Sequence, residues 1–515
     1  MQRDRTVGAL GAAIACALII GAVAQDAKPS ASLAELKQRL AEFVSQPKFG
    51  AAMWGVKVVS LDSEKTLFEH NPQKLFSPAS NSKLFTVTLA LERLGPDYRV
   101  KTSLYAPLKP DPAGTVQGDL IMYGRGDPCI NARLHGGDVF RALQPLVAGL
   151  TNAGVKHIAG DLVGDESYFR GSTVGSGWTW EDMETAYGAE ISALAINDNT
   201  LQITVRPGEH TGAPCKLVLS PVTAVLSLSN RTTTANPGQK RTIRLRHAPG
   251  DNLFLVTGQM ASDDSGYSED VPVHNPALLF LSLFREALAR NGIQVAGGTR
   301  MLNWLDREKS PIALDQMVEL GSGSSLTVAE WAKETLKPSQ NLYADLLLAQ
   351  VGEKVRTGQH SSNQTSEELG IAELAQFLLK AGIKKDEVLF DEGSGLSRNN
   401  LATPNATVAL LEFAARRPWS ETFIQALPVA GVDGTLRERM KGTAAEGKVR
   451  AKTGTLRWVS SLSGHVTTAG GERLVFSLML NRYHTTDPNR PARTEVDALA
   501  LMLAEFKGRS EEENR

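Results

Sequence analysis

Three short segments of the sequence combine residue types that could carry out acyl transfer. The first, SPASNSKLFT at 77–86, places Ser80 three residues before Lys83 at the start of an apolar run with helical spacing. Positions i and i+3 lie on one face of a helix, so the amine can reach the hydroxyl. A serine hydroxyl becomes a good nucleophile only when a base takes its proton. The segment alone leaves a second interpretation open, in which Ser80 is a helix cap and Lys83 a solvated charge.

The other two segments could supply partners for this pair. Ser339-Gln340-Asn341 follows a helix that is predicted to stop before Pro338, and it precedes a second apolar helix. Small polar residues at such a link are commonly only caps. Lys452-Thr453-Gly454-Thr455 lies in a candidate strand, where a glycine often marks the close approach of another backbone. Each segment alone is weak, but together they favour catalysis over three independent structural coincidences.

A lysine acts as a base near neutral pH only if its pKa is lowered. A free lysine has a pKa of about 10.4, and a reduction by roughly 3 units corresponds to about 4 kcal/mol in favour of the neutral amine. Burial and a second cation both act in this direction. We expect Lys452 to be that cation for Lys83. We also expect Ser339 to relay the proton to the leaving amine and Asn341 to orient Lys83 and the substrate amide.

Both ends of the chain predict strands of one sheet that would position these segments. The expected strands are 54–61 and 66–69 near the start, and 449–455, 461–467 and 473–480 near the end. Helices are expected after Ser32, from the opening segment to Leu94, and at 494–506. This order predicts an α+β fold whose antiparallel sheet is built from both chain ends.

Composition excludes several classes of protein. The 515 residues are 42% hydrophobic and 22% charged, which is typical of globular domains, and the net charge of −1 gives no basic field for nucleic acid. Because the sequence has no clustered His/Cys spacing and no Gly-x-x-x-x-Gly-Lys loop, we expect no metal and no other cofactor.

The N-terminus predicts export. Arg3 and Arg5 precede an apolar run that ends in Ala22-Val23-Ala24, the pattern of a secretory signal peptide cleaved after Ala24; an uncleaved anchor is the alternative. Cleavage would leave Cys129 and Cys215, for which a disulfide and two buried thiols both stay open.

With these motifs in place, the chain resembles the class C low-molecular-mass penicillin-binding proteins, the D-alanyl-D-alanine carboxypeptidases/endopeptidases, nearly from end to end. The resemblance also rests on Gly126-Asp127-Pro128, Gly160-Asp161-Leu162 with Asp165 and Phe169, Gly177-Trp178, Ser192-Ala193-Leu194 with Asn197 and Asn199, Gly393-Ser394-Gly395-Leu396-Ser397-Arg398, Leu427-Pro428-Val429-Ala430-Gly431 and Gly434-Thr435-Leu436. Gln340 stands where Asp is commoner, and Arg125 and Glu392 also depart from the usual pattern.

The resemblance implies an α+β, penicillin-binding/serine β-lactamase-like domain with an antiparallel five-stranded sheet flanked by helices. This catalytic domain would be formed by 31–97 and 274–507 after a signal peptide at 1–24. Residues 98–273, which contain many short candidate strands between Gly, Pro and Asn, would form inserted β-rich domains at approximately 98–190 and 191–273.

The implied function is that of a periplasmic serine-type D-Ala-D-Ala carboxypeptidase and/or endopeptidase, which acts on peptidoglycan peptides through an acyl-enzyme and is inhibited covalently by β-lactams. The implied catalytic residues are Ser80, Lys83, Ser339, Asn341 and Lys452. The backbone N–H groups of Ser80 and Thr455 would form the oxyanion hole, and Thr453, Gly454, Thr455, Asp165 and Phe169 would bind substrate. A β-lactamase and a non-catalytic cell-wall binding protein stay open, although the length and the intact polar residues argue against them.

Overall fold

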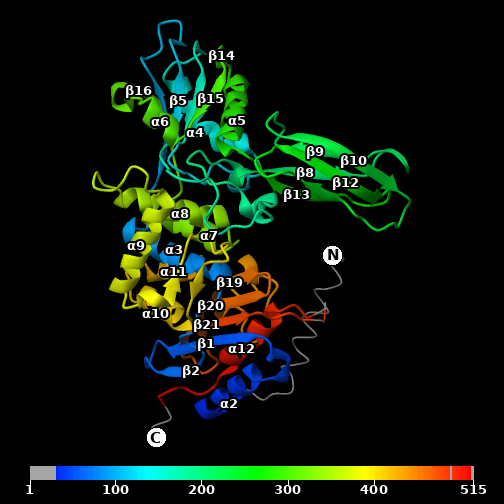
Figure 1. Ribbon diagram of the computed structural model, residues 1–515, viewed down its shortest axis with the longest axis vertical. Coiled ribbons are helices and arrows are strands. Elements are labelled where there is room, and N and C mark those ends of the chain that lie inside the picture. Colours follow the sequence, from blue (N-terminus) through cyan, green and yellow to red (C-terminus); the bar gives the residue numbers. More distant parts are fainter. Residues whose placement is uncertain (1–29, 486, 488–489, 512–515) are drawn as a thin grey trace. The chain divides into compact units, whose positions relative to one another are not determined.

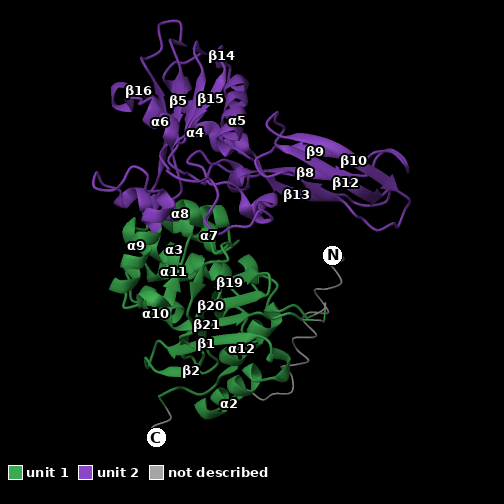
Figure 2. Cartoon of the chain, viewed as in Figure 1, with its two compact units in different colours: residues 1–97, 328–347, 371–515 green, residues 98–327, 348–370 purple. Residues whose placement is uncertain are grey.

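The computed structural model describes residues 30–485, 487 and 490–511, so the predicted signal peptide lies outside the described residues. The chain forms two compact units (Figure 2). Unit 1 comprises the described residues within 1–97, 328–347 and 371–515, and unit 2 comprises 98–327 and 348–370. None of the helices in the described ranges has the length and apolar character that crossing a membrane requires.

Unit 1 is built on a five-stranded antiparallel sheet of the order β19-β20-β21-β1-β2 (Figure 1). Its strands are β1 (Met53–Ser60), β2 (Thr66–His70), β19 (Val449–Leu456), β20 (Val459–Thr467) and β21 (Arg473–Asn481). β1 pairs with β21 along its whole length, which joins the two ends of the chain. The predicted α+β fold with one antiparallel sheet from both chain ends is therefore confirmed.

Unit 1 also contains helices, several of which pack on this sheet. They are α2 (Leu33–Val44), α3 (Ser82–Arg93), α7 (Val328–Leu336), the first part of α8 (Asn341–Val355), the last part of α9 (Ser366–Lys380), α10 (Pro404–Ala415), α11 (Ser420–Ala426) and α12 (Arg493–Glu505). Alternate residues of β21, such as Leu474 and Phe476, join α2 and α12 in one core. α10 packs on β21 and β1, and every residue of β21 after Arg473 is buried. The sheet is therefore a rigid support for the segments at its edge.

His465 on β20 is a buried titratable residue that should make unit 1 sensitive to acid. Burial lowers the pKa of His465 to about 4. In the unfolded chain its pKa is about 6.5, so the unfolded state binds the proton first, and stability is lost as pH falls from about 6.5 to about 4. Between pH 7 and pH 5 the loss from this group is roughly 2 kcal/mol.

The expected result is that His465→Phe, which keeps a ring but cannot titrate, loses less stability than the wild type over this pH range. Urea unfolding of both proteins at the two pH values measures the difference. Equal losses in the two proteins would show that His465 is not the acid-sensitive group.

Unit 2 contains four sheets. One has the order β15-β7-β5-β3-β16, and the others are β14-β6-β4, β13-β8-β9 and β10-β12-β11. Their strands are β3 (Lys101–Ala106), β4 (Thr115–Val116), β5 (Leu120–Tyr123), β6 (His157–Ile158), β7 (Leu162–Asp165), β8 (Thr200–Arg206), β9 (Lys216–Ser220), β10 (Ser227–Ala235), β11 (Arg244–Arg246), β12 (Leu253–Ala261), β13 (Tyr267–Pro272), β14 (Gln294–Val295), β15 (Thr299–Leu302) and β16 (Val318–Ser324). Helices α4 (Val139–Asn152), α5 (Pro276–Arg290) and α6 (Trp304–Lys309) accompany them. Cys129 and Cys215 are buried thiols that are not joined to each other.

Unit 2 runs on to Thr327, past the Val273 that the sequence analysis gives as the end of the inserted domains. The physical reason lies in α5 and β15. Apolar residues of α5 belong to the core of unit 2, and β15 pairs in parallel with β7. The predicted subdivision of the insertion near residue 190 stays a prediction.

Candidate active site

Ser80 lies in η2 (Ala79–Asn81), a 3₁₀ turn that leads directly into α3. Ala79 has a φ of +49°, a left-handed conformation that costs energy for a residue with a side chain. The residue that caps α3 is Asn81, and it makes no side-chain cap bond. Ser80 is therefore not a helix cap, and its Oγ instead lies 3.0 Å from the Lys83 amine.

Lys83 is fully buried, and three hydrogen bonds hold its amine. Nζ lies 2.6 Å from Asn341 Oδ1, 2.6 Å from the Ser394 carbonyl oxygen and 3.0 Å from Ser80 Oγ. The first two partners can only accept, whereas a hydroxyl can also donate. A neutral amine has two N–H groups and one lone pair, so its lone pair must face the Ser80 hydroxyl. This arrangement can remove a proton from Ser80.

Burial lowers the pKa of Lys83 to about 8, while the nearby carboxylates of Glu392 and Asp345 act in the opposite direction. A pKa of about 8 leaves about a tenth of the amine neutral at pH 7. Burial is thus the main cause of the lowered pKa, whereas the sequence analysis also expected a contribution from Lys452.

Ser339 and Lys452 form a second hydroxyl–amine pair. Lys452 Nζ donates to Ser339 Oγ at 2.7 Å and to the Thr453 carbonyl at 2.9 Å. Ser339 lies on the link between α7 and α8 with a φ of +67°, a strained conformation typical of functional sites. Burial, and then the charge of Lys83, hold the pKa of Lys452 well below its usual value. The ammonium form of Lys452 is accordingly a stronger acid than a solvated lysine.

Gly454 holds β19 against the nucleophile turn. A Cβ at this position would lie 2.1 Å from Ser461 Oγ and 2.4 Å from the Pro78 carbonyl oxygen, distances that no real side chain tolerates. Ser461 Oγ donates to the same carbonyl at 2.7 Å. The absence of a side chain therefore lets the strand and the Ser80 turn touch.

The outer edge of β19 is covered only in part. At Arg450 it pairs with Val429, and beyond that bridge no other strand among the described residues pairs with this edge. Thr453 Oγ1 donates to Thr435 Oγ1 at 2.8 Å, and the neighbouring Thr455 is exposed. An edge of this kind offers unpaired backbone groups to an extended peptide.

The remaining predicted site residues, Asp165 and Phe169, belong to unit 2. Asp165 is buried and forms an ion pair with Arg307 at 2.8 Å. Phe169 contacts Tyr168, with the ring centroids 5.4 Å apart, and it fills the space beside Gly126. Their predicted role in substrate binding stays a prediction.

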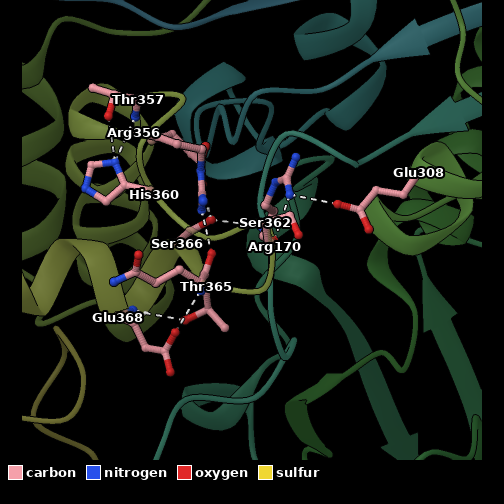
Figure 3. A network of polar contacts seen from close by, with 11 residues as sticks. Arg170, Glu308, Arg356, Thr357, His360, Ser362, Thr365, Ser366 and Glu368 are labelled. Carbon is pink, nitrogen blue, oxygen red and sulfur yellow. Dashed lines mark hydrogen bonds and ion pairs between the residues drawn. The ribbon is translucent and has the colours of Figure 1, made fainter.

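The next residue, Arg170, anchors this loop within unit 2 (Figure 3). Its guanidinium donates to Glu308 at 2.9 Å and to the Ser362 carbonyl at 2.8 Å, and its backbone N–H donates to Ser366 Oγ at 2.8 Å. Both the side chain and the backbone of Arg170 thus fix the segment that carries Phe169.

The sequence analysis did not identify the Ser394 carbonyl, Glu392 or Asp345 as groups that act on the lysine. The Ser394 carbonyl is a backbone group and has no signature in a sequence. Asp345 follows Asn341 by one turn of α8, a spacing that puts both on one helix face and could have identified it.

Comparisons with known proteins agree with this arrangement. The D-Ala-D-Ala carboxypeptidase 3 (S13) family matches residues 36–505. The D-alanyl-D-alanine carboxypeptidase of Actinomadura sp. (strain R39) is 33% identical over 494 residues, which cover 93% of this chain and 86% of that protein. The D-alanyl-D-alanine carboxypeptidase DacB of Haemophilus influenzae is 27% identical and covers 83% of this chain and 85% of its own length.

The fold also matches a solved structure. Penicillin binding protein 4 (dacB) from Haemophilus influenzae superposes with a TM-score of 0.74 at 24% identity and covers 92% of this chain and 98% of that chain. Its complex with a β-lactam gives a TM-score of 0.68, also at 24% identity, over 91% of this chain and 97% of that chain. The family match spans most of the chain, and the fold agrees with it. The chain therefore belongs to the D-Ala-D-Ala carboxypeptidase 3 (S13) family of low-molecular-mass penicillin-binding proteins, and it is a serine-type D-Ala-D-Ala carboxypeptidase.

Proposed function

We propose that Ser80 is the nucleophile of this enzyme and Lys83 its base. The observation that carries this proposal is the set of three bonds at Lys83 Nζ, which points its lone pair at Ser80 Oγ. Ser80 Oγ attacks the carbonyl carbon of the penultimate D-alanine, and the hydroxyl proton passes to Lys83. Asn341 keeps the amine in place during this step.

Ser339 and Lys452 protonate the leaving group. As the peptide bond breaks, the amine of the terminal D-alanine takes the proton of Ser339, and Lys452 replaces it across their 2.7 Å hydrogen bond. Lys83 has then gained one proton and Lys452 has lost one, so the charge of the site is unchanged. Mutual repulsion between two buried lysines favours a single shared proton, which makes this exchange easy. Water reverses the steps when it releases the acyl group.

The substrate backbone lies along the open edge of β19. The N–H groups of Ser80 and Thr455 stabilise the oxyanion, which is worth about 100- to 1000-fold in rate for each donor. The hydroxyls of Thr453 and Thr455 bind the terminal carboxylate, and Gly454 keeps the strand close to the nucleophile.

Ser339→Ala should lower kcat/KM for a D-Ala-D-Ala peptide by about 10²- to 10⁴-fold, because the leaving amine loses its proton donor. Steady-state release of D-alanine measures the loss. Gln340→Ala on the same link is the matched control and should change the rate by less than about threefold. Similar rates for the two variants would exclude Ser339 as the relay.

The substrates are peptides of peptidoglycan, and β-lactams are covalent inhibitors that leave a slowly hydrolysed ester on Ser80. The protein acts after export, in the periplasm. Cleavage of a cross-linked peptide uses the same acylation step, so the site serves both a carboxypeptidase and an endopeptidase.

Incubation of the purified enzyme with cross-linked muropeptides, followed by product masses, tests this function. Loss of one alanine identifies the carboxypeptidase reaction, and scission of dimers identifies the endopeptidase reaction. If neither product forms and penicillin does not label the protein, the proposed function is wrong.

A further inference from the structure

A loop at 392–400 in unit 1, which is buried except at Arg398 and Asn399, carries the Ser394 carbonyl that bonds to Lys83. The Ser394 carbonyl accepts a hydrogen bond from the Lys83 amine at 2.6 Å, and the Gly393 carbonyl accepts one from Thr86 Oγ1 at 2.7 Å. Lys83 and Thr86 lie one turn apart on α3, so two successive carbonyls of the loop are bound to one face of that helix.

The same loop also touches the nucleophile turn. A Cβ at Gly395 would lie 2.0 Å from the Ala79 carbonyl oxygen, so the two backbones are in direct contact. Asn400 Nδ2 donates to Ser82 Oγ at 3.3 Å. A displacement of the loop would therefore move both the base and the serine.

The carboxylate of Glu392, which is fully buried, is the centre of this loop. Oε2 accepts from the Ser394 N–H at 2.8 Å and from the Ser394 hydroxyl. Oε1 accepts from the Gly395 N–H at 2.7 Å, from Asn400 Nδ2 at 2.8 Å and from the Ser397 N–H at 3.4 Å. Because both oxygens accept from the loop, the loop folds around this one side chain.

Glu392 also contributes charge. Lys83 and Lys452 are both fully buried, and buried charges need partners of opposite sign. Glu392 and Asp345 are the carboxylates that act on Lys83, and Asp345 Oδ1 accepts from the Gly393 N–H of the same loop at 3.0 Å. The two lysines thus share their site with two carboxylates that also shape it.

We propose that Glu392 is a positioning residue for Lys83. Its carboxylate fixes the Ser394 carbonyl against the lysine amine, and its negative charge compensates the positive charge that this amine gains when it takes the proton of Ser80. This inference rests on the proposed role of Lys83 as the base.

Two substitutions separate the two effects. Glu392→Gln keeps the length of the side chain but removes the charge and turns an NH₂ group toward backbone donors. The acid limb is the part of the pH–rate profile in which the acylation rate rises as Lys83 loses its proton. Because the pKa of Lys83 falls without the charge, the midpoint of this limb should move down by about 1 pH unit or more. Glu392→Asp keeps the charge but withdraws it by one methylene. This variant should keep the wild-type acid limb and lose about 10- to 100-fold in rate, because the amine is misplaced.

The measurement is the second-order rate constant for acylation by fluorescent penicillin between about pH 6 and pH 9, together with a thermal unfolding curve for each variant. Asp391→Asn is the matched control. This part-exposed carboxylate in the neighbouring position accepts from Asn399 Nδ2 at 2.7 Å, and the bond from the Asp391 backbone N–H to Asn400 Oδ1 at 2.9 Å is kept by the substitution. Its rate and acid limb should equal those of the wild type.

A folded Glu392→Gln variant with the acid limb of the wild type would overturn the proposal, since a merely structural role lowers stability without moving the limb. If this variant does not fold, Glu392→Asp decides, and a rate equal to that of the wild type overturns the proposal. Failure of the proposed function looks different, because the wild type itself would then release no D-alanine and take no label.

Discussion

Ser80→Ala should abolish acylation by both D-Ala-D-Ala peptides and penicillin, with a loss in kcat of up to about 10⁶-fold, as for other serine nucleophiles. The substitution removes the attacking oxygen and nothing that Lys83 needs for its other two bonds, to Asn341 and Ser394. The fold should therefore persist. Labelling with fluorescent penicillin, followed by intact mass, measures the effect directly.

The control for this experiment lies in the same segment. Ser77→Ala removes a part-exposed hydroxyl three residues before the nucleophile and should leave labelling unchanged. Labelling of the Ser80→Ala variant at the wild-type rate would assign the acyl-enzyme to another residue, and the mass of the labelled peptide would identify it.

Local chemistry explains which parts of the structure could be predicted. The strands of the five-stranded sheet lie within two residues of their expected bounds, because both alternation and turn residues mark them. Glycines also mark the ends of α4, α5 and α9, since Gly154, Gly292 and Gly382 adopt positive φ there.

Tertiary contacts explain what the sequence could not predict. The apolar periodicity of α5 is the same whether the helix packs on the catalytic sheet or on unit 2, so it does not reveal that unit 2 continues to Thr327. The Ser394 carbonyl reaches Lys83 because the loop is folded around Glu392. No spacing of residue types in the sequence indicates this contact. The interpretation of Ser80 as a cap failed for a related reason, because its hydroxyl is taken by the lysine and not by the helix backbone.

Lys83→Met should lower the acylation rate by about 10²- to 10⁴-fold, the usual contribution of a general base. Methionine keeps an unbranched chain of similar length in the buried site, so the change isolates the amine. The pH profile gives a second readout. In the wild type the rate should rise with pH and level off above about 8, because only the neutral amine is a base and the pKa of Lys83 is about 8. The variant should lose this limb.

Lys337→Met is a suitable comparison, since Lys337 is a part-buried lysine of the same unit that pairs with Asp433 at 2.6 Å. Such a pair contributes at most about 1 kcal/mol to stability and nothing to proton transfer, so this variant should keep the acid limb of the wild type. If Lys83→Met kept the limb as well, the titrating base would have to be another group. Lys452, whose pKa is also lowered by burial, would then be the base in place of Lys83. It would take up the proton through Ser339, to which it is hydrogen-bonded.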